Sequence, residues 1–550
     1  MNLNKRGAFC PSFFYNIIMK FLLALIILFI FSCSKPESPV ETGFRENILH
    51  IANGSEPQGL DPHIVTGVPE HRLLTSLCEG LLITNPKGGP NLPGVAKSWD
   101  ISDDGLVYTF NLQPLAKWSN GEDVTAEDFV WSWMRILTPS LGSQYPDMLY
   151  YVKNAAAYHM EEINDFSLVG IKALDSKTLE VTLEQPYSFF LKILSHYSTY
   201  AVPKNVVLAH GTIDDRNGEW TRPGNFVCNG PMQLKSWELN KSIVVEKNPY
   251  YWDVEKVTLN EMYFYPIVNE STEDRMFRAG QLHATYSVPQ EKCPVYINAN
   301  NPNLRIDPYV GVYFYRINTL NPVLKDKRVR QALAYSIDRE QIVKRVSQCG
   351  QSPANSFTPP GIDGYFPDTQ IPFDPELAAQ LFAEAGFPAG EGFPKLEILF
   401  NTQEGHRKIA LAVQQMWQKY LGIEVELVNT DWKVYLSREM IGDFQISRAG
   451  WIGDYEDPNT FLDLMRPNRG NNKTGWENKK YEELIIKANA QPNQENRYAI
   501  LREAEQLLID EMPVLPIYIY VRQYLLSNDV KGWDPNPTDT HHPKFITLER

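Results

Sequence analysis

Apolar and polar residues alternate with a period of two in several short segments, which is the pattern of a strand with one buried face. Tyr108, Phe110 and Leu112 show it clearly within the range 99–118. Because the pattern restarts after Pro203, the later strands are expected to belong to a different sheet from the earlier ones. Further strands are predicted at residues 46–52, at 168–183 as two strands around a turn, and at 243–246, 261–266, 313–318, 396–401 and 423–429.

A period of 3.6 residues predicts helices in other segments. Leu74, Leu77 and Leu81 recur at helical spacing within 70–82. The run Thr125-Ala126-Glu127-Asp128 has the form of a capping box at the start of an apolar-faced helix. Since helices alternate with strands from residue 375 onward, a parallel or mixed sheet with covering helices is expected there. Further helices are predicted across 329–337, 375–385 and 407–420.

Length and charge narrow the class of protein. A chain of 550 residues is several times the usual domain size of about 100 to 200, so at least two lobes are expected and three are favoured. With 43% hydrophobic and 21% charged residues, the composition is that of a globular protein. The formal net charge of -14 argues against a nucleic-acid partner, because phosphate binding requires a basic surface.

The N-terminus has the form of a secretion signal. Lys5, Arg6 and Lys20 are basic, and the run 21–31 is wholly apolar and ends at Ser32-Cys33. An apolar run of this length is too short to span a bilayer comfortably. Residues 1–32 are therefore predicted to be a signal peptide.

The segment 29–33 resembles a bacterial lipobox, with an aliphatic residue three places before Cys33 and the small Ser32 directly before it. Phe31 departs from the pattern, since a small residue is usual there. The resemblance implies lipid attachment at Cys33, and residues 33–45 are then expected to form a lipid-anchored tether to the membrane. A plain cleaved signal or an uncleaved anchor stays an alternative.

Four cysteines remain beyond the signal region, and they suit an oxidising compartment. They could form two disulfides in any of three connectivities, and their spacing shows no metal pattern. The four are Cys78, Cys228, Cys293 and Cys349.

A set of motifs along the whole mature chain resembles the periplasmic oligopeptide-binding proteins of ABC importers, within the family 5 extracellular solute-binding proteins. The resemblance implies an α/β, three-lobed periplasmic-binding-protein type II fold with two lobes closing on the ligand. The motifs include Gly59-Leu60-Asp61-Pro62-His63, Glu79-Gly80-Leu81-Leu82, Trp118-Ser119-Asn120-Gly121, Asn229-Gly230-Pro231, Val329-Arg330-Gln331-Ala332-Leu333 and Leu515-Pro516-Ile517-Tyr518.

Mapped onto this chain, the resemblance implies a discontinuous first lobe. Hinges are expected near residues 310 and 521, where the chain crosses twice between the same lobes. The expected ranges are 36–79, 204–309 and 522–550 for lobe I, 80–203 for lobe II and 310–521 for lobe III.

The segment 449–458 is the most specific part of the resemblance. A free peptide offers an ammonium group, a run of amides and a carboxylate, and in the similar family the aspartate of this motif pairs with the ammonium, which points to Asp454. Burying an ammonium without such a partner would be prohibitive. Trp451 lies in the same motif, and Gly450 and Ile452 would offer backbone groups to the peptide as an added strand, opposite Val68.

Other positions match family residues around the ligand. Trp432, Tyr145 and Tyr520 match aromatic residues that line the site. Arg438 and Arg448 match arginines near the carboxylate end of the peptide. His406, in the segment that begins at Asn401, matches a histidine that meets the carboxylate of a longer peptide, and cationic groups at staggered depths would accept several peptide lengths.

The chain departs from the family pattern at several positions. Thr66 stands where close relatives place an acidic residue near the ammonium. Ile452 and Gly311 replace a pair of cysteines, so a disulfide of some relatives is absent. Ala334 occupies a position where some relatives have a lysine facing the pocket, which leaves the preferred peptide length open.

The expected function is that of an extracytoplasmic lipoprotein, in the periplasm or at the cell surface. It captures short peptides through their main chain and termini, hands them to an ABC permease, and needs no cofactor or metal. A monomer is expected, with membrane contact through the lipid. The adjacent His541-His542 and the acidic residues of 454–457 lack the spacing of a metal site.

Three alternatives stay open. The same fold could bind another solute, such as a dipeptide, a murein peptide, a sugar, a nickel complex or haem. A secreted hydrolase is a second alternative, although the chain has no Gly-x-Ser-x-Gly, no His-Glu-x-x-His and no phosphate-cradling loop. Binding could also serve signalling or wall recycling instead of nutrition.

Overall fold

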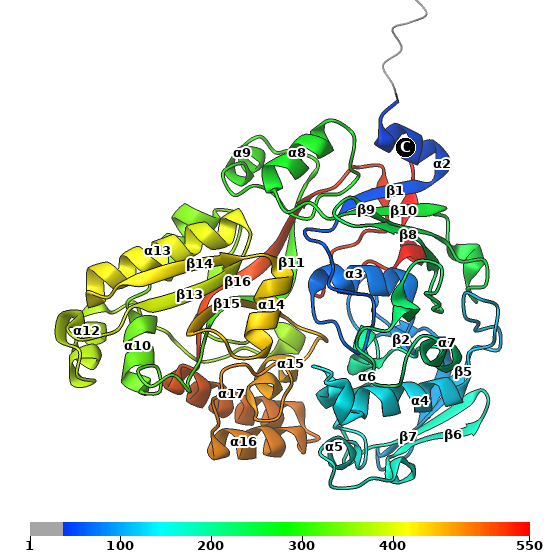
Figure 1. Cartoon of the computed structure of the whole chain (residues 1–550), viewed down its shortest axis with the longest axis horizontal. Helices are drawn as coiled ribbons and strands as arrows, with labels where there is room; N and C mark the ends of the chain where they lie inside the picture. Colours follow the sequence, from blue (N-terminus) through cyan, green and yellow to red (C-terminus); the bar gives the residue numbers. More distant parts are fainter. Residues whose placement is uncertain (1–36) are drawn as a thin grey trace, which may run out of the picture.

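The computed structural model describes residues 37–550 (Figure 1). The predicted signal peptide and Cys33 lie outside the described residues. The predicted tether 33–45 is not free chain throughout, because α2 (Pro39–Glu46) packs on the first strand of the fold. Ser38 and Glu41 cap this helix, with the Ser38 amide donating to the Glu41 carboxylate at 2.8 Å.

The first of three larger sheets brings together distant parts of the chain. Its β1 runs parallel to β10, and its remaining pairs are antiparallel. Helix α3 (Val68–Leu77) packs against β8, and α8 (Glu270–Arg278) and α9 (Cys293–Asn298) follow β10 in the chain. The strand order is β1 (Ile48–Ala52), β10 (Glu261–Tyr265), β9 (Ser242–Lys247) and β8 (Met232–Glu238).

The second sheet is wholly antiparallel, and α4 (Ala126–Leu137) packs on it. The capping box predicted at Thr125 is confirmed, because the Asp128 carboxylate accepts from the Thr125 amide at 2.8 Å. Short helices α5 (Ala155–His159), α6 (Phe190–Ile193) and α7 (Lys204–Ala209) complete this part of the molecule. The strand order is β4 (Ala96–Ile101), β5 (Val107–Leu112), β7 (Thr178–Thr182) and β6 (Ile171–Asp175).

The third sheet is mixed, as the alternation of helices and strands predicts. Its β13 runs parallel to β14 and β15, whereas β11 is antiparallel to both β15 and β16. The strand order is β12 (Ser352–Pro353), β16 (Val514–Leu525), β11 (Leu304–Ile317), β15 (Ile446–Ile452), β13 (Leu396–Asn401) and β14 (Val425–Thr430).

Helices surround the third sheet on both faces and at one end (Figure 1). Among them α12 packs on α10 and α13, and α16 packs on α17. The helices are α10 (Lys327–Tyr335), α11 (Arg339–Ile342), α12 (Pro375–Glu384), α13 (Glu404–Leu421), α14 (Trp432–Met440), α15 (Asn459–Leu462), α16 (Lys479–Asn489) and α17 (Gln494–Glu511).

Some predicted elements differ from the observed ones. The helix predicted over 70–82 ends at Leu77, because Cys78 is extended and the chain then pairs as β2 (Leu82–Ile83) with β3 (Leu92–Pro93). The strand predicted at 313–318 is the second half of a longer strand, β11. Its first half pairs with β16 but contains Pro308, and a proline inside a run demotes it as a strand prediction. The helix predicted across 329–337 ends at Tyr335.

Two disulfides settle the open connectivity. They join Cys78 to Cys228 and Cys293 to Cys349, with Cα atoms 5.2 and 5.6 Å apart. The first bond ties the end of α3 to the segment before β8, so it closes a loop that contains the whole second sheet. The second ties α9 to the segment before β12.

The sheets occupy distinct stretches of the chain, and the long strands β11 and β16 run from the third sheet toward the first (Figure 1). The predicted lobe boundaries stay a prediction.

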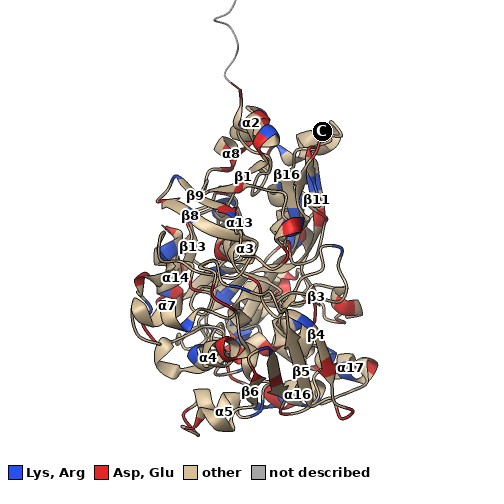
Figure 2. Ribbon diagram, turned by 90° about the vertical axis from the view of Figure 1, so that its right-hand side faces the viewer, with Lys and Arg blue, Asp and Glu red and all other residues tan. Residues whose placement is uncertain are grey.

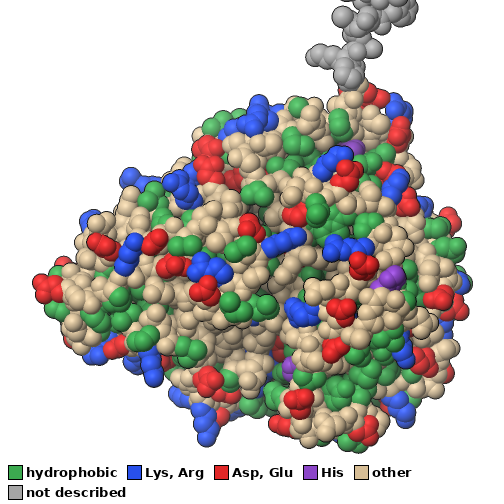
Figure 3. All heavy atoms as spheres, viewed as in Figure 1, with side chains coloured by type: hydrophobic (Ala, Val, Ile, Leu, Met, Phe, Trp, Pro, Cys, Tyr) green, Lys and Arg blue, Asp and Glu red, His purple; other side chains and the backbone are tan. Residues whose placement is uncertain are grey.

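No helix within residues 37–550 is both long and apolar enough to cross a bilayer. Figure 2 shows Lys and Arg interspersed with Asp and Glu over the ribbon, and the face in Figure 3 shows the same mixture among hydrophobic side chains. The last strands are β17 (Val530–Lys531) and β18 (Thr547–Leu548).

Candidate functional site

A cavity of about 300 Å³ lies between the elements of the three sheets. Its walls come from the segment before α3, from β15 and β16, from the first turn of α13 and from residues beside the second sheet. Eleven of the twelve predicted ligand-contacting residues line it, so the fold gathers side chains from widely separated segments. They are Val68, Tyr145, Asn401, His406, Trp432, Arg448, Gly450, Trp451, Ile452, Asp454 and Tyr520.

Asp454 follows the end of β15 and presents its carboxylate to the cavity. Its Oδ1 accepts from the Tyr145 hydroxyl at 3.4 Å and lies 3.3 Å from His196 Nε2. The Asp454 side chain is only 10% exposed, and within residues 37–550 it pairs with no lysine or arginine. A carboxylate enclosed in this way has lone pairs to offer to a cationic group.

Tyr145 supports this carboxylate as a hydrogen-bond donor. Burial, with the neighbouring charge of Asp454 adding to it, raises the pKa of Tyr145 well above its ordinary value. The hydroxyl therefore keeps its proton at neutral pH. His196 was not predicted to contribute: it comes from a loop beside the second sheet, and nothing in its local sequence marks it.

One edge of β15 has no partner strand along part of its length. On one side the strand pairs with β11, from Gly311 opposite Ile452 to Ile317 opposite Ile446. On the other side β13 pairs only with Ile446 and Ser447. The remaining edge, which contains Gly450 to Ile452, lines the cavity. Its backbone groups can pair with an extended guest.

Two glycines allow the close packing around this edge. A Cβ on Gly450 would lie 2.7 Å from the Tyr520 hydroxyl, and one on Gly311 would lie 2.5 Å from Cδ1 of Ile452. A larger residue at either position would displace its neighbour. At the position where some relatives of similar sequence have two cysteines, the side chain of Ile452 packs closely against Gly311.

Arg448 carries a positive charge on the cavity wall. Its Nη2 donates to the Tyr520 hydroxyl at 2.7 Å, and its Nη1 donates to Asn401 Oδ1 at 3.4 Å. The guanidinium also lies over the Tyr313 ring, 4.9 Å from its centroid. In the described part of the chain Arg448 forms no ion pair with a carboxylate, so its charge is available to an anionic group of a guest.

His406 lies in the first turn of α13 and is buried. Burial, with the charge of Arg448 adding to it, lowers the pKa of His406 well below its ordinary value. The imidazole is therefore neutral at neutral pH, and from the cavity wall it can donate a hydrogen bond to a guest. Its contact with the carboxylate of a longer peptide stays a prediction.

The structure does not bring Arg438 to the cavity. Its guanidinium pairs with Glu397 at 2.9 Å and Asp443 at 2.8 Å, outside the cavity. Trp432, Tyr435 and Glu439 lie on one face of α14 because they are three and four residues apart, and Arg438 lies beside that face. Arg438 is therefore left out of the proposed site.

Two of the three departures from the family pattern also lie at the cavity. Thr66 lines it, as does Ile452. Ala334 does not: it is fully buried in the core of the third-sheet region. Ala334 therefore makes no contact with the cavity, and the preferred peptide length stays open.

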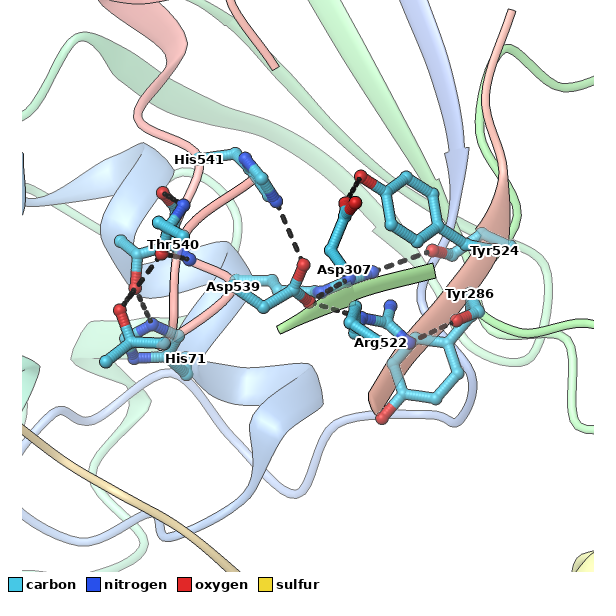
Figure 4. A network of polar contacts seen from close by, with 12 residues as sticks. His71, Tyr286, Asp307, Arg522, Tyr524, Asp539, Thr540 and His541 are labelled. Carbon is cyan, nitrogen blue, oxygen red and sulfur yellow. Dashed lines mark hydrogen bonds and ion pairs between the residues drawn. The ribbon is translucent and has the colours of Figure 1, made fainter. Parts of the chain in front are cut away.

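A buried ionic cluster forms another part of the wall (Figure 4). Asp539 Oδ2 lies 2.6 Å from Arg522 Nε and 2.7 Å from Arg72 Nη2, and Asp539 Oδ1 lies 2.9 Å from His541 Nε2. Arg522 Nη1 also donates to the Tyr286 carbonyl at 2.6 Å. No local pattern in the sequence indicates this cluster, because its members come from α3, β16 and the C-terminal segment.

Several side chains that the sequence analysis considered as metal ligands are bonded to other residues. His541 contacts Asp539, and His542 lies 3.5 Å from Glu79. Asp457 pairs with Arg497, with both distances below 3 Å. No group of three or more His, Cys, Asp and Glu side chains in residues 37–550 is arranged to hold a metal ion.

Comparison with known proteins identifies the family. The family model for bacterial extracellular solute-binding proteins, family 5, matches residues 92–473, which is more than half of the chain. The chain belongs to this family. It is 37% identical to the periplasmic oligopeptide-binding protein OppA of Salmonella typhimurium, over 97% of this chain and 99% of that protein. The resemblance stated from the sequence is therefore confirmed.

Solved structures confirm the α/β periplasmic-binding-protein type II fold. The Escherichia coli murein tripeptide binding protein MppA matches with a TM-score of 0.87 at 34% identity, over 92% of this chain and 98% of that chain. The unliganded open form of the same protein matches with a TM-score of only 0.63, at the same identity, over 92% and 97% of the two chains. The arrangement of this family 5 protein is thus unlike the open form.

Proposed function

We propose that this family 5 protein captures short peptides outside the cytoplasm and delivers them to an ABC permease without chemical change. The observation that carries the proposal is the enclosed carboxylate of Asp454 beside the unpaired edge of β15. A peptide ammonium is a cation that this carboxylate can hold, and the peptide amides can pair with the edge. Arg448 lies farther along the same strand, as the carboxylate end of an extended guest requires.

The names of similar proteins support the ligand class. One relative is an oligopeptide-binding protein, and the structural neighbour binds a murein tripeptide. An oligopeptide and a murein tripeptide both contain peptide bonds. Backbone pairing carries no information about side chains, so the proposed site accepts varied sequences.

Closure of two lobes around the guest is part of the proposal. Lobe I comprises 36–79, 204–309 and 522–550, lobe II 80–203 and lobe III 310–521. The only crossings proposed between lobes I and III are near residues 310 and 521, within β11 and close to the middle of β16. The lower TM-score of the open form supports a hinge that changes the relative placement of the lobes.

The proposal is tested by identifying what the purified protein carries. Mass spectrometry under non-denaturing conditions is expected to detect intact short peptides, and calorimetry is expected to show that di- to pentapeptides bind. After incubation the peptides should be recovered uncleaved, because the cavity is proposed to bind and not to react. Recovery of haem, a nickel complex or a sugar instead, or of cleaved peptides, would contradict the proposal.

We further propose that Cys33 carries a lipid and anchors the protein at the periplasmic membrane face or the cell surface. In the variant Cys33→Ala, incorporation of labelled fatty acid and recovery in the membrane fraction should both be lost. Cys10→Ala is the matched control, because Cys10 lies inside the predicted signal peptide. Equal labelling of both variants would exclude Cys33 as the lipid site.

A further inference from the structure

Three carboxyl side chains line the cavity, and they differ in their partners. Asp539 pairs with two arginines, and Asp454 lies next to His196. Glu270 is different. Over residues 37–550 it forms no ion pair with a lysine, arginine or histidine, and its hydrogen-bond partners are the neutral side chains of Gln403, with Nε2 at 3.0 Å, and Ser287. A carboxylate on a cavity wall without a cation has capacity for a cationic guest group.

Glu270 lies between two elements that meet at the cavity. It is the first residue of α8, and Gln403 directly precedes α13. Burial raises the pKa of Glu270 to about 7, and the nearby Glu291 and Glu404 add to this effect, while the hydrogen bonds from Gln403 and Ser287 oppose it. The empty site therefore holds this carboxyl group with little compensation for the loss of water.

A second group at the same end of the cavity also lacks a partner. Gln290 Oε1 is buried and accepts no hydrogen bond from any residue of 37–550. Its amide lies against the first turn of α13, because a Cβ on Gly405 would come within 2.8 Å of Gln290 Nε2. A buried acceptor without a donor is destabilising, so a donor on the guest would stabilise it.

The surrounding charges do not supply this donor. Lys408 pairs with Glu291 at 3.3 Å and Glu404 at 3.1 Å, and it does not line the cavity. Glu273 accepts from the backbone amide of Tyr286. The two arginines that line the cavity are directed elsewhere, because Arg448 donates to the Tyr520 hydroxyl and Arg522 pairs with Asp539.

We propose that Glu270 and Gln290 form a subsite for a cationic side chain, lysine or arginine, of the bound peptide. This inference rests on the proposed function. A lysine ammonium carries three donors and can satisfy both the carboxylate and the amide oxygen. Charge-assisted hydrogen bonds in an enclosed site are the stronger kind. The subsite therefore adds a side-chain preference to a receptor that otherwise reads the main chain.

The test compares alanine tri-, tetra- and pentapeptides that carry one lysine at each position in turn with the same peptides carrying norleucine. Norleucine keeps the length of the side chain but has no ammonium. At one position, the wild-type protein is expected to bind the lysine peptide at least about tenfold more tightly than the norleucine peptide. In Glu270→Gln the ratio of the two affinities should fall to near one, and in Gln290→Met it should fall by a few-fold.

Glu426→Gln is the control, because this exposed residue neither lines the cavity nor contributes to the pKa of Glu270. It should keep the wild-type ratio. A lysine preference that survives Glu270→Gln, or no lysine preference at any position in the wild-type protein, would overturn the inference. Failure of the all-alanine peptides to bind the wild-type protein would instead refute the proposed function itself. Circular dichroism checks that each variant is folded.

Discussion

In the variant Asp454→Asn, the affinity for a peptide with a free amino terminus is expected to fall roughly 100- to 1,000-fold. The substitution keeps the size of the side chain and an acceptor for Tyr145, but it removes the negative charge. A peptide ammonium in the enclosed cavity would then lack a counter-charge, and its lost hydration would not be replaced. Folding stability should change by no more than about 1 kcal/mol, since Asp454 has no lysine or arginine partner to leave unpaired.

Calorimetry with a peptide and its N-acetylated form separates charge from other effects. The wild-type protein should bind the free-amine peptide far more tightly, whereas the variant should bind both forms with similar affinity. Glu456→Gln is the control, since it removes a charge two residues along the same loop but outside the cavity. If the variant keeps the wild-type preference for the free amine, Asp454 is not the ammonium partner.

The second large effect is on stability. Asp539→Asn is expected to lower the free energy of unfolding by about 3–5 kcal/mol, because breaking a buried pair leaves its partners uncompensated. The side chains of Arg72, Arg522 and Asp539 are 8%, 9% and 5% exposed. Two arginines would therefore remain in the interior with no carboxylate. Denaturant unfolding followed by tryptophan fluorescence at pH 7 measures the loss.

The pH dependence gives an independent check of the same cluster. Burial alone would raise the pKa of Asp539, but Arg522 and Arg72 outweigh it and hold the pKa well below its usual range. The pKa of this aspartate in the unfolded chain is about 3.9, and above that pH ionised Asp539 contributes its full stabilisation to the fold. The contribution is lost as the pH falls from there through the lower pKa of Asp539 in the folded protein. In Asp539→Asn this part of the acid destabilisation should be missing.

An exposed ion pair serves as the control for this variant. Lys395 and Glu426 lie 2.8 Å apart, but their side chains are 54% and 57% exposed. Glu426→Gln should change the free energy of unfolding by less than about 0.5 kcal/mol. Equal stability of Asp539→Asn and the wild-type protein would show that the cluster contributes nothing net.

The sequence predicts those features of the fold and site that leave a local pattern. Period-two alternation identified most strands of the three sheets, and the segment 449–458 pointed to Asp454 and the edge of β15. Pairings between distant segments left no such pattern. The contact between His196 and Asp454 joins residues 258 apart, and no spacing in the sequence could place one beside the other.

Where the structure adds to or departs from the sequence prediction, the physical causes are similar. Arg438 matched a family position, but its place on α14 turns it toward Glu397 and Asp443. His406 lines the cavity as predicted, and its low pKa follows from burial, which composition and spacing do not reveal. Glu270 drew no attention in the sequence, because a glutamate at the start of a helix is usually a solvent-exposed residue that favours the helix dipole.

The unpaired backbone of β15 also affects which polypeptides can reach it inside the cavity. A free strand border in solution invites another chain to join it, and proteins commonly blunt such borders to avoid aggregation. Here the border is enclosed instead of blunted, in a chamber of about 300 Å³. If the proposed function holds, this border would pair only with thin, unfolded fragments, and the shape of the chamber would discriminate against intact proteins without any dedicated filter.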